Sequence, residues 1–223
     1  MIEDCYSITA VHCLKGGDGL VADARGQYKA DFPGRSARRM THLGMMVSLC
    51  LRELGVSRNV PVVYASAFAE SESLEKFIDS FPAASPALFQ TSIHPSAVEQ
   101  ALIPTQTAVD RFYPVSSDVN LAGKALENCI VLSEDEAILV GGEERGTWLC
   151  EHGMASERSF AFGLRLARGE ATGALGRLQL RVDGAAARCP SVDLPTFARA
   201  LIRRESICLP SDGLGASLQV EWS

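Results

Sequence analysis

Ser117 and His94 are the residues of this chain whose types best suit acyl-transfer chemistry. A serine hydroxyl that a histidine activates is a nucleophile toward esters and thioesters. The segment Ser116-Ser117-Asp118 has a second interpretation, because these residue types accept hydrogen bonds from the first amides of a helix. No Gly-x-Ser-x-Gly motif surrounds either serine. The sequence therefore favours a capping role for this segment and leaves Ser117 with His94 as the catalytic alternative.

Five further residues are candidates for binding, together with His94. Arg35, Arg38 and Arg39 form a small basic cluster, which is either a solvated helix surface or a contact for a phosphate group. Phe89 and Gln90 lie close to His94 in the sequence and are candidates for the mouth of a pocket. His94 itself is expected to hold the loop before its helix, and the other role open to it is that of a general base.

Metal and nucleotide chemistry is not indicated. His12, His42 and His152 have no carboxylate or cysteine neighbour at metal-ligand spacing. The glycine segments 16–19 and 141–144 fit neither of the common phosphate-binding patterns and are predicted to be turns. We therefore predict neither a metal site nor a bound cofactor.

Composition narrows the class of partner. The chain has 223 residues, of which 47% are hydrophobic, and a net charge of −6. These values are typical of a globular protein, and they offer no basic surface for nucleic acid or for an anionic membrane. No apolar run approaches the ~18 residues of a membrane span, and the acidic start lacks the features of a signal peptide.

The seven cysteines are scattered and never spaced as Cys-x-x-Cys. Most lie among apolar residues, as Cys50 and Cys129 do. We interpret them as small core residues in a reducing compartment and predict a cytoplasmic location.

Periodicity predicts alternating strands and helices. Strands are expected at 5–14, 60–66, 136–142, 159–167, 175–182 and 216–222. Helices are expected at 36–54, with the basic cluster at the N-terminal part of this helix, and at 70–80, 119–130 and 194–203, with another beginning at 94–96. Leu74, Phe77 and Ile78 would form the apolar side of the second helix, and Asp118 would cap the third. Residues 85–92 would be a loop or extended, and 184–189 a surface connection. This alternation predicts a layered α/β domain.

Three segments, in this order, resemble the β-ketoacyl synthase-like N-terminal domain family. They are Pro33-Gly-Arg-Ser-Ala-Arg-Arg-Met-Thr-His-Leu-Gly-Met-Met46; Pro61-Val-Val-Tyr-Ala-Ser66 with Ser85-Pro-Ala-Leu-Phe-Gln-Thr-Ser-Ile-His-Pro-Ser-Ala97; and Val115-Ser-Ser-Asp-Val-Asn120 with Ala137-Ile-Leu-Val-Gly-Gly-Glu143. Members of that family are short proteins often called ketosynthase chain-length factors. The match is best over about 35–150.

The resemblance implies a thiolase-like α/β half-domain, truncated relative to a full ketosynthase. Residues 1–223 would form this single domain, with 175–223 completing it. The implied partners are a β-ketoacyl synthase and an acyl carrier protein, whose phosphopantetheine would carry the substrate. The implied setting is aryl polyene, fatty-acid or polyketide-type chain elongation, in a heterodimer or a homodimer that places the Phe89 region near its subunit interface.

The departures from that family's enzymes concern the catalytic groups. A ketosynthase uses a cysteine at the N-terminus of a buried helix, where the helix dipole lowers its pKa. The matching stretch here is Ser116-Ser117-Asp118, and the second half of the fold, which supplies two catalytic histidines, is missing. His94-Pro95 also replaces the family's usual His-Asn. We therefore expect a non-catalytic subunit that assists a partner synthase; the alternatives are a serine acyltransferase or hydrolase, and a homodimer that binds acyl carrier protein.

Overall fold

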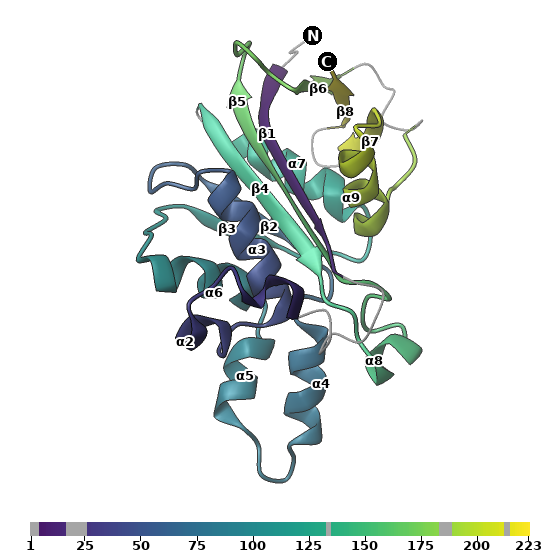
Figure 1. The fold of residues 1–223 in the computed structure, drawn as a ribbon. Coiled ribbons are helices and arrows are strands. Elements are labelled where there is room, and N and C mark those ends of the chain that lie inside the picture. Colours follow the sequence, from purple (N-terminus) through teal and green to yellow (C-terminus); the bar gives the residue numbers. More distant parts are fainter. Residues whose placement is uncertain (1–4, 17–25, 133–134, 183–188, 212–214) are drawn as a thin grey trace.

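A mixed β-sheet of eight strands runs through the molecule (Figure 1). The computed structural model describes residues 5–16, 26–132, 135–182, 189–211 and 215–223. The strand order is β3-β2-β4-β5-β1-β6-β8-β7, in which β2 is parallel to β3 and β4 and the other pairs are antiparallel. The strands are β1 (Cys5–Lys15), β2 (Val62–Ala65), β3 (Phe112–Val115), β4 (Glu136–Glu143), β5 (Phe160–Arg168), β6 (Gly176–Arg181), β7 (Ile207–Ser211) and β8 (Ala216–Trp222).

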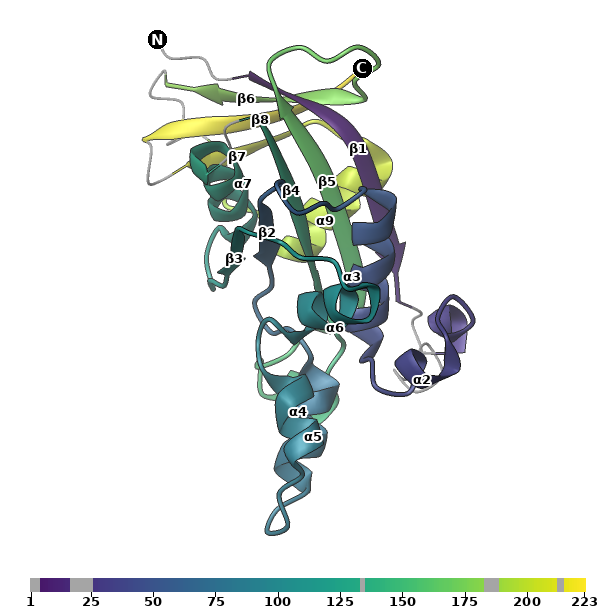
Figure 2. The same cartoon turned by 90° about the vertical axis from the view of Figure 1, so that its left-hand side faces the viewer.

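Helices cover both faces of this sheet (Figure 2). They are α2 (Gly34–Ala37), α3 (His42–Glu53), α4 (Ser71–Asp79), α5 (Pro86–Ser92), α6 (Ser96–Thr105), α7 (Leu121–Leu132), α8 (Trp148–Glu151) and α9 (Leu194–Arg203). α3 and α6 lie on one face, α7 and α9 lie on the other, and α4 and α5 extend as a hairpin beyond the end of the sheet. Within the described ranges, no helix is long and apolar enough to cross a membrane.

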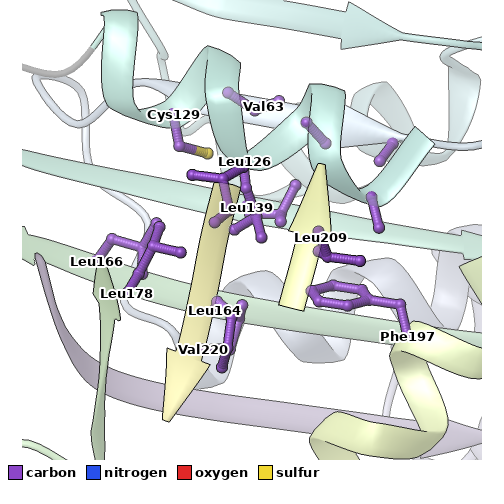
Figure 3. Packing of buried hydrophobic residues seen from close by; sticks show 14 of the residues in the cluster. Val63, Leu126, Cys129, Leu139, Leu164, Leu166, Leu178, Phe197, Leu209 and Val220 are labelled. Carbon is purple, nitrogen blue, oxygen red and sulfur yellow. The ribbon is translucent and has the colours of Figure 1, made fainter. Parts of the chain in front are cut away.

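Strand alternation divides the core between the two faces. Val63 and Ala65 of β2 join the cluster beneath α7 and α9, whereas Val62 and Tyr64 join the cluster beneath α3 and α6. In the first cluster, the rings of Phe162 and Phe197 meet edge to face with their centroids 5.4 Å apart. Figure 3 shows Phe197 of α9 beside Leu209, with Leu126 of α7 over Leu139. Both faces are thus closed by helices, as the predicted α/β class requires.

Most of the predicted elements are confirmed, but several details differ. The 85–92 segment is the helix α5, not a loop: Ser85 Oγ accepts a hydrogen bond from the Leu88 amide at 3.4 Å, and Pro86 occupies the first turn. The basic cluster belongs to α2 and the residues after it, because α3 begins only at His42. β3 and β7 were not expected from the sequence because both are short and contain proline.

The buried side of α4 also differs from the expected one. Ser71 and Glu75 are buried, whereas Ile78 is 40% exposed. Leu74 and Phe77, predicted with Ile78 to form the apolar side of this helix, are only partly buried. The carboxylate of Glu75 accepts hydrogen bonds from backbone amides around α8 on the buried side.

The glycine turn predicted at 141–142 is instead part of β4. The absence of side chains at these two positions lets the strands pack closely. A Cβ on Gly141 would strike the Ala65 carbonyl oxygen of β2, and one on Gly142 would strike the Phe160 carbonyl oxygen of β5. The pair therefore marks close packing between strands, not a change of direction.

The cysteines also depart from expectation. Cys189 and Cys208 form a disulfide, with their Cα atoms 5.6 Å apart, that links the segment before α9 to β7. Cys50 and Cys129 are free and buried, as predicted. Most of the surface connection predicted at 184–189 lies outside the described residues.

Candidate functional site

The junction between β3 and α7 corresponds to the position where the resemblance places the ketosynthase nucleophile. Ser117 is half-buried there and lies in a tight turn: its hydroxyl donates to the Val119 carbonyl oxygen at 2.9 Å and accepts from the Val119 amide at 3.3 Å. Lys124 Nζ of α7 donates to the same hydroxyl at 2.7 Å. No sequence pattern indicated this lysine contact, which forms because α7 places Lys124 beside the junction.

The predicted capping role of Ser116, Ser117 and Asp118 is wrong. α7 begins at Leu121, so Asn120 is the residue directly before the helix. Asn120 has a positive φ of 52°, and its side-chain Nδ2 donates to the Pro210 carbonyl oxygen of β7 at 2.9 Å. Residues 116–120 connect β3 to α7, and within this connection Ser116 and Asp118 are exposed.

His94 lies elsewhere, between α5 and α6. Its ring packs against Tyr64 of β2 with the centroids 5.1 Å apart, on the face that α3 and α6 cover. Burial lowers the pKa of His94, which favours the neutral imidazole. Across the described ranges, no hydrogen bond joins His94 to Ser117. The structure therefore does not form the Ser117–His94 pair that the sequence left open.

The structure adds a group of buried glutamates near the ends of β2 and β4. Glu143 accepts hydrogen bonds from the amides of Ala67, Phe68 and Ala69, at 2.7, 3.0 and 3.1 Å, and from Ser66 Oγ at 3.0 Å. Burial raises its pKa to about 7, and the four donors oppose that rise. Glu143 thus fixes the loop that leaves β2.

Two further carboxylates hold the α4–α5 hairpin to the sheet. Glu144 accepts from the Leu43 amide of α3 at 3.4 Å and from the Glu72 amide of α4 at 3.1 Å. Glu75 of α4 accepts from the Thr147 amide at 2.6 Å and the Leu149 amide at 2.9 Å. The carboxyl groups of Glu144, directly after β4, and Glu75, which contacts the start of α8, therefore anchor the hairpin.

Glu70 is bound less completely. Its Oε1 accepts from Ser96 Oγ at 2.7 Å, while its Oε2 is buried without a hydrogen-bond partner in the described structure. Burial raises the pKa of Glu70 to about 8, so the carboxyl group is largely protonated at neutral pH. A hydrogen-bond chain continues from Ser96 through Gln100 to Thr41, at 3.1 and 2.6 Å, and reaches the start of α3. The sequence feature that could have indicated this buried polar group is the run of polar residues on the buried side of α4, namely Ser71, Ser73 and Glu75.

A groove of about 1410 Å³ lies between the start of α3 and the helices α4, α5 and α6. Arg38, Arg39 and Gln90 all line it. The side chain of Arg35 lies outside the described part of the structure. Phe89 is half exposed and packs against Phe77, with ring centroids 5.3 Å apart. The structure thus places part of the predicted binding set in one groove and sets Phe89 on the hairpin beside it.

The groove combines several kinds of surface. Ser96, Gln100 and Thr41 supply hydroxyl and amide groups. The charged lining includes Glu72 and Glu99 as well as Arg38, Arg39 and Lys76, and Lys76 is paired with Glu72 at 2.7 Å. Within the described ranges, no three His, Cys, Asp or Glu side chains are arranged to hold a metal ion. The groove thus presents hydrogen-bonding amide and hydroxyl groups together with side chains of both charges.

The comparisons with known proteins concern the fold. No family model matches the sequence, and no curated protein does. Among solved structures, a chain of a ketosynthase (ApeO) in complex with its chain length factor (ApeC) from Xenorhabdus doucetiae matches with a TM-score of 0.66 and 16% identity, covering 97% of this chain and 98% of that one. The ishigamide ketosynthase/chain length factor matches with a TM-score of 0.54 and 14% identity, covering 89% and 73%.

These matches extend over almost the whole chain, well beyond 35–150, where the sequence resemblance was best. At such low identity they establish the architecture and leave the activity open. The predicted class, a mixed sheet with helices packed on its faces, is confirmed. The chain therefore has the thiolase-like α/β fold of these ketosynthase and chain-length-factor structures.

Proposed function

We propose that this chain is a non-catalytic ketosynthase-like subunit, similar to a chain length factor, that assists a partner β-ketoacyl synthase in acyl chain elongation. The observation that carries the proposal is the β3–α7 junction. At the position expected for a nucleophilic cysteine, Ser117 shares hydrogen bonds with Val119 and Lys124. The aryl polyene, fatty-acid or polyketide-type setting and the cytoplasmic location belong to the same proposal.

The chemistry of condensation supports this interpretation. The enzyme must hold an acyl group as a thioester, which requires a thiolate with a lowered pKa. A serine hydroxyl in the same place would form an ester, and Asp118 beside it would raise the pKa of any thiol introduced there. The hydrogen bonds of Ser117 therefore favour a structural role for the junction over a catalytic role in condensation.

The sheet edge offers a surface for the partner. β3 pairs with β2 on one side only within the described sheet, so its outer edge is open to a strand of another chain. Pro114 lacks an amide proton, which limits the ladder that such a strand could form. Pairing through this edge, or through the face that carries α7, would give a heterodimer.

Reconstitution with a β-ketoacyl synthase from the same genome tests the proposal. The mixture should elute as one complex, and the length of the product chains should differ from that made by the synthase alone. Ser117→Ala should leave both results unchanged, because the proposed role needs no nucleophile. Separate elution together with an unchanged product length would contradict the proposal.

A serine acyltransferase is the second candidate, and the Lys124–Ser117 contact of 2.7 Å is the observation that favours it. Lysine replaces the histidine expected from the sequence as the group next to the hydroxyl. A fluorophosphonate or acyl-thioester probe should then label the wild type and fail to label Ser117→Ala. An unlabelled wild type would remove this candidate.

Carrier-protein binding is a finer part of the main proposal. Arg38, Arg39 and Lys76 line a groove that also presents amide and hydroxyl groups, which suits the phosphate and the amides of phosphopantetheine. Arg38→Glu with Arg39→Glu should weaken binding of acyl carrier protein several-fold, whereas Arg199→Glu on the exposed side of α9 should not. Equal binding by all three proteins would argue against this groove. Binding by a homodimer without any synthase would favour the binding-protein alternative.

A further inference from the structure

Cys189 and Cys208 lie where a disulfide can form and break. Their Cα atoms are 5.6 Å apart, within the usual range for a disulfide, and both residues are partly exposed, so a thiol in solution can reach the sulfur atoms. Cys189 belongs to the segment before α9, and Cys208 is the second residue of β7. The bond therefore joins two elements through residues that are 19 positions apart in the sequence.

The other cysteines are less suited to such an exchange. The thiolate is the form that attacks a disulfide, and burial raises the pKa of Cys13 to about 12. Burial also raises the pKa values of Cys50 and Cys129. Cys5 and Cys150 are partly exposed and free, and neither has a cysteine partner within the described ranges. The bonded pair is thus the place where a thiol–disulfide equilibrium can change this structure.

The two bonded elements complete one end of the core. β7 pairs with β8 alone within the described sheet and forms its edge. α9 has ten residues, a length at which an isolated helix is marginal in water, so packing must hold it in place. Figure 3 shows Leu209 of β7 beside Phe197 of α9. The disulfide adds a covalent link to this packing.

β7 also contacts the junction between β3 and α7. The carbonyl oxygen of Pro210, two residues after Cys208, accepts a hydrogen bond from Asn120 Nδ2 at 2.9 Å. Asn120 directly precedes α7, and a Cβ on Gly123 in the first turn would strike the same carbonyl oxygen. β7 therefore packs tightly on the start of α7, and a change in the position of β7 would alter this contact.

From this arrangement we propose that Cys189 and Cys208 form a reversible redox switch. The disulfide form links α9 to β7 and orders the contact between β7 and α7, and the dithiol form loosens all three elements. The inference is independent of the proposed function, because it needs no partner protein. A reducing compartment, which the scattered cysteines predict, would keep the pair as thiols until oxidised glutathione accumulates.

Glutathione supplies the electrons for the change. One glutathione thiolate attacks a sulfur of the disulfide, which breaks the S–S bond, forms a mixed disulfide and releases the other cysteine as a thiolate that takes up a proton. A second glutathione thiolate attacks the glutathione sulfur of the mixed disulfide and releases the second cysteine. Two glutathione molecules thereby become glutathione disulfide, and two electrons and two protons pass to the cysteine pair. Oxidation by glutathione disulfide is the reverse.

Hydrogen exchange of the full chain in reduced and in oxidised glutathione buffers tests the switch. We expect the amides of 194–201 and 207–211 to exchange at least ~10-fold faster after reduction, whereas those of 62–65 in β2 should not change. The Lys124 amide, which donates to the Asn120 carbonyl oxygen at the start of α7, should also exchange faster.

Two single variants separate the disulfide from other effects of the buffer. Cys208→Ser cannot form the bond, so its exchange should match that of the reduced wild type in both buffers. Cys150→Ser is the matched control, since Cys150 is also partly exposed but free, and it should respond as the wild type does. Reduction should lower the Tm of the wild type by roughly 5–10 °C and leave that of Cys208→Ser unchanged.

Maleimide labelling after acid quenching counts the free thiols in each buffer. Labelling of both cysteines in oxidised glutathione would overturn the inference, because the bond then does not form. A bond that persists in reduced glutathione would overturn it as well, because it is then a permanent crosslink. Equal exchange of the two forms would mean that the bond holds nothing in place, and the inference would be wrong. Faster exchange in α9 and β7 with an unchanged Lys124 amide would overturn the link to α7.

Discussion

Buried carboxyl groups differ from one another in this chain according to the donors that reach them. Glu143 accepts four hydrogen bonds, whereas Glu70 accepts one from Ser96 and has a second oxygen without a partner in the described structure. The pKa of Glu70 is therefore the more strongly raised, to about 8 against about 7 for Glu143. Protonation relieves the desolvation of a buried carboxylate.

The stability of the protein should consequently depend on pH through Glu70. The folded state holds this proton more tightly than the unfolded chain, whose pKa is near 4.5. The contribution is fully present below about pH 4.5 and is lost as the pH rises to about 8, so stability falls over that window. Tyr64, Ser96 and Glu144 are polar groups that interact with it.

Glu70→Gln keeps an acceptor for Ser96 and removes the ionisation. Urea unfolding from pH 4.5 to 9 should show a shallower decline for the variant. The difference in the free energy of unfolding between the two proteins should change by a few kcal/mol, at about 1.4 kcal/mol per pKa unit. Glu143 and Glu144 titrate in both proteins and cancel in this difference. Parallel curves would show that Glu70 ionises normally.

At the scale of elements, the junctions after β2 and β4 decide where the hairpin sits. Glu143 at the end of β4 and Glu144 directly after it bind the loop after β2 and the first turns of α3 and α4. The residues at the end of β4 therefore hold the loop after β2, the start of α3 and the start of α4 in place. This dependence is a consequence of parallel pairing, because β2 and β4 bring their carboxyl ends to the same edge of the sheet.

Glu143→Ala should destabilise the protein by about 3 kcal/mol, because several backbone amides lose their acceptor and each buried amide left unpaired costs about 1–3 kcal/mol. Denaturant unfolding gives the value. Glu53→Ala is the control, since its side chain is 52% exposed, and it should change stability by less than about 0.5 kcal/mol. A loss in Glu143→Ala as small as in the control would show that water replaces the carboxylate.

For the whole molecule, the described strands form one sheet that the last forty residues help to complete. β8 pairs with β6 along residues 176–181, and Phe197 of α9 closes the core over Phe162. This arrangement supports the expectation that 175–223 belongs to the same domain as the rest, which we put forward as a prediction.

A chain that ends at Val182 tests it. Without α9, β7 and β8, the apolar residues beneath α9 would be exposed to water, at a cost of ~25 cal/mol per Å². We expect such a chain to lack a cooperative thermal transition and a native near-ultraviolet spectrum, both of which the full chain should show. Cooperative unfolding of the shorter chain would mean that 1–182 folds by itself.

The sequence by itself determined the class of fold and most of its elements. Apolar periodicity located α3, α7, α9 and the long strands, because burial on one side of a helix or on both sides of a strand leaves a direct pattern. The start of α5 was missed: Ser85-Pro86 is a serine cap followed by proline, which favours a helix, but 85–92 was predicted to be a loop or extended. The resemblance to ketosynthase-like domains gave the same architecture that the structural matches have.

Tertiary structure decided the details that depend on contacts distant in sequence. Ser117 lies beside Lys124 and not beside His94, because the sheet separates α7 from the face on which His94 packs. On the polar side of α4, buried Glu75 accepts hydrogen bonds from the amides of Thr147 and Leu149, which lie more than 70 residues further along the chain. The periodicity of apolar residues indicates which residues share one face of a helix or strand. Which other residues contact that face depends on how the elements pack in the tertiary structure.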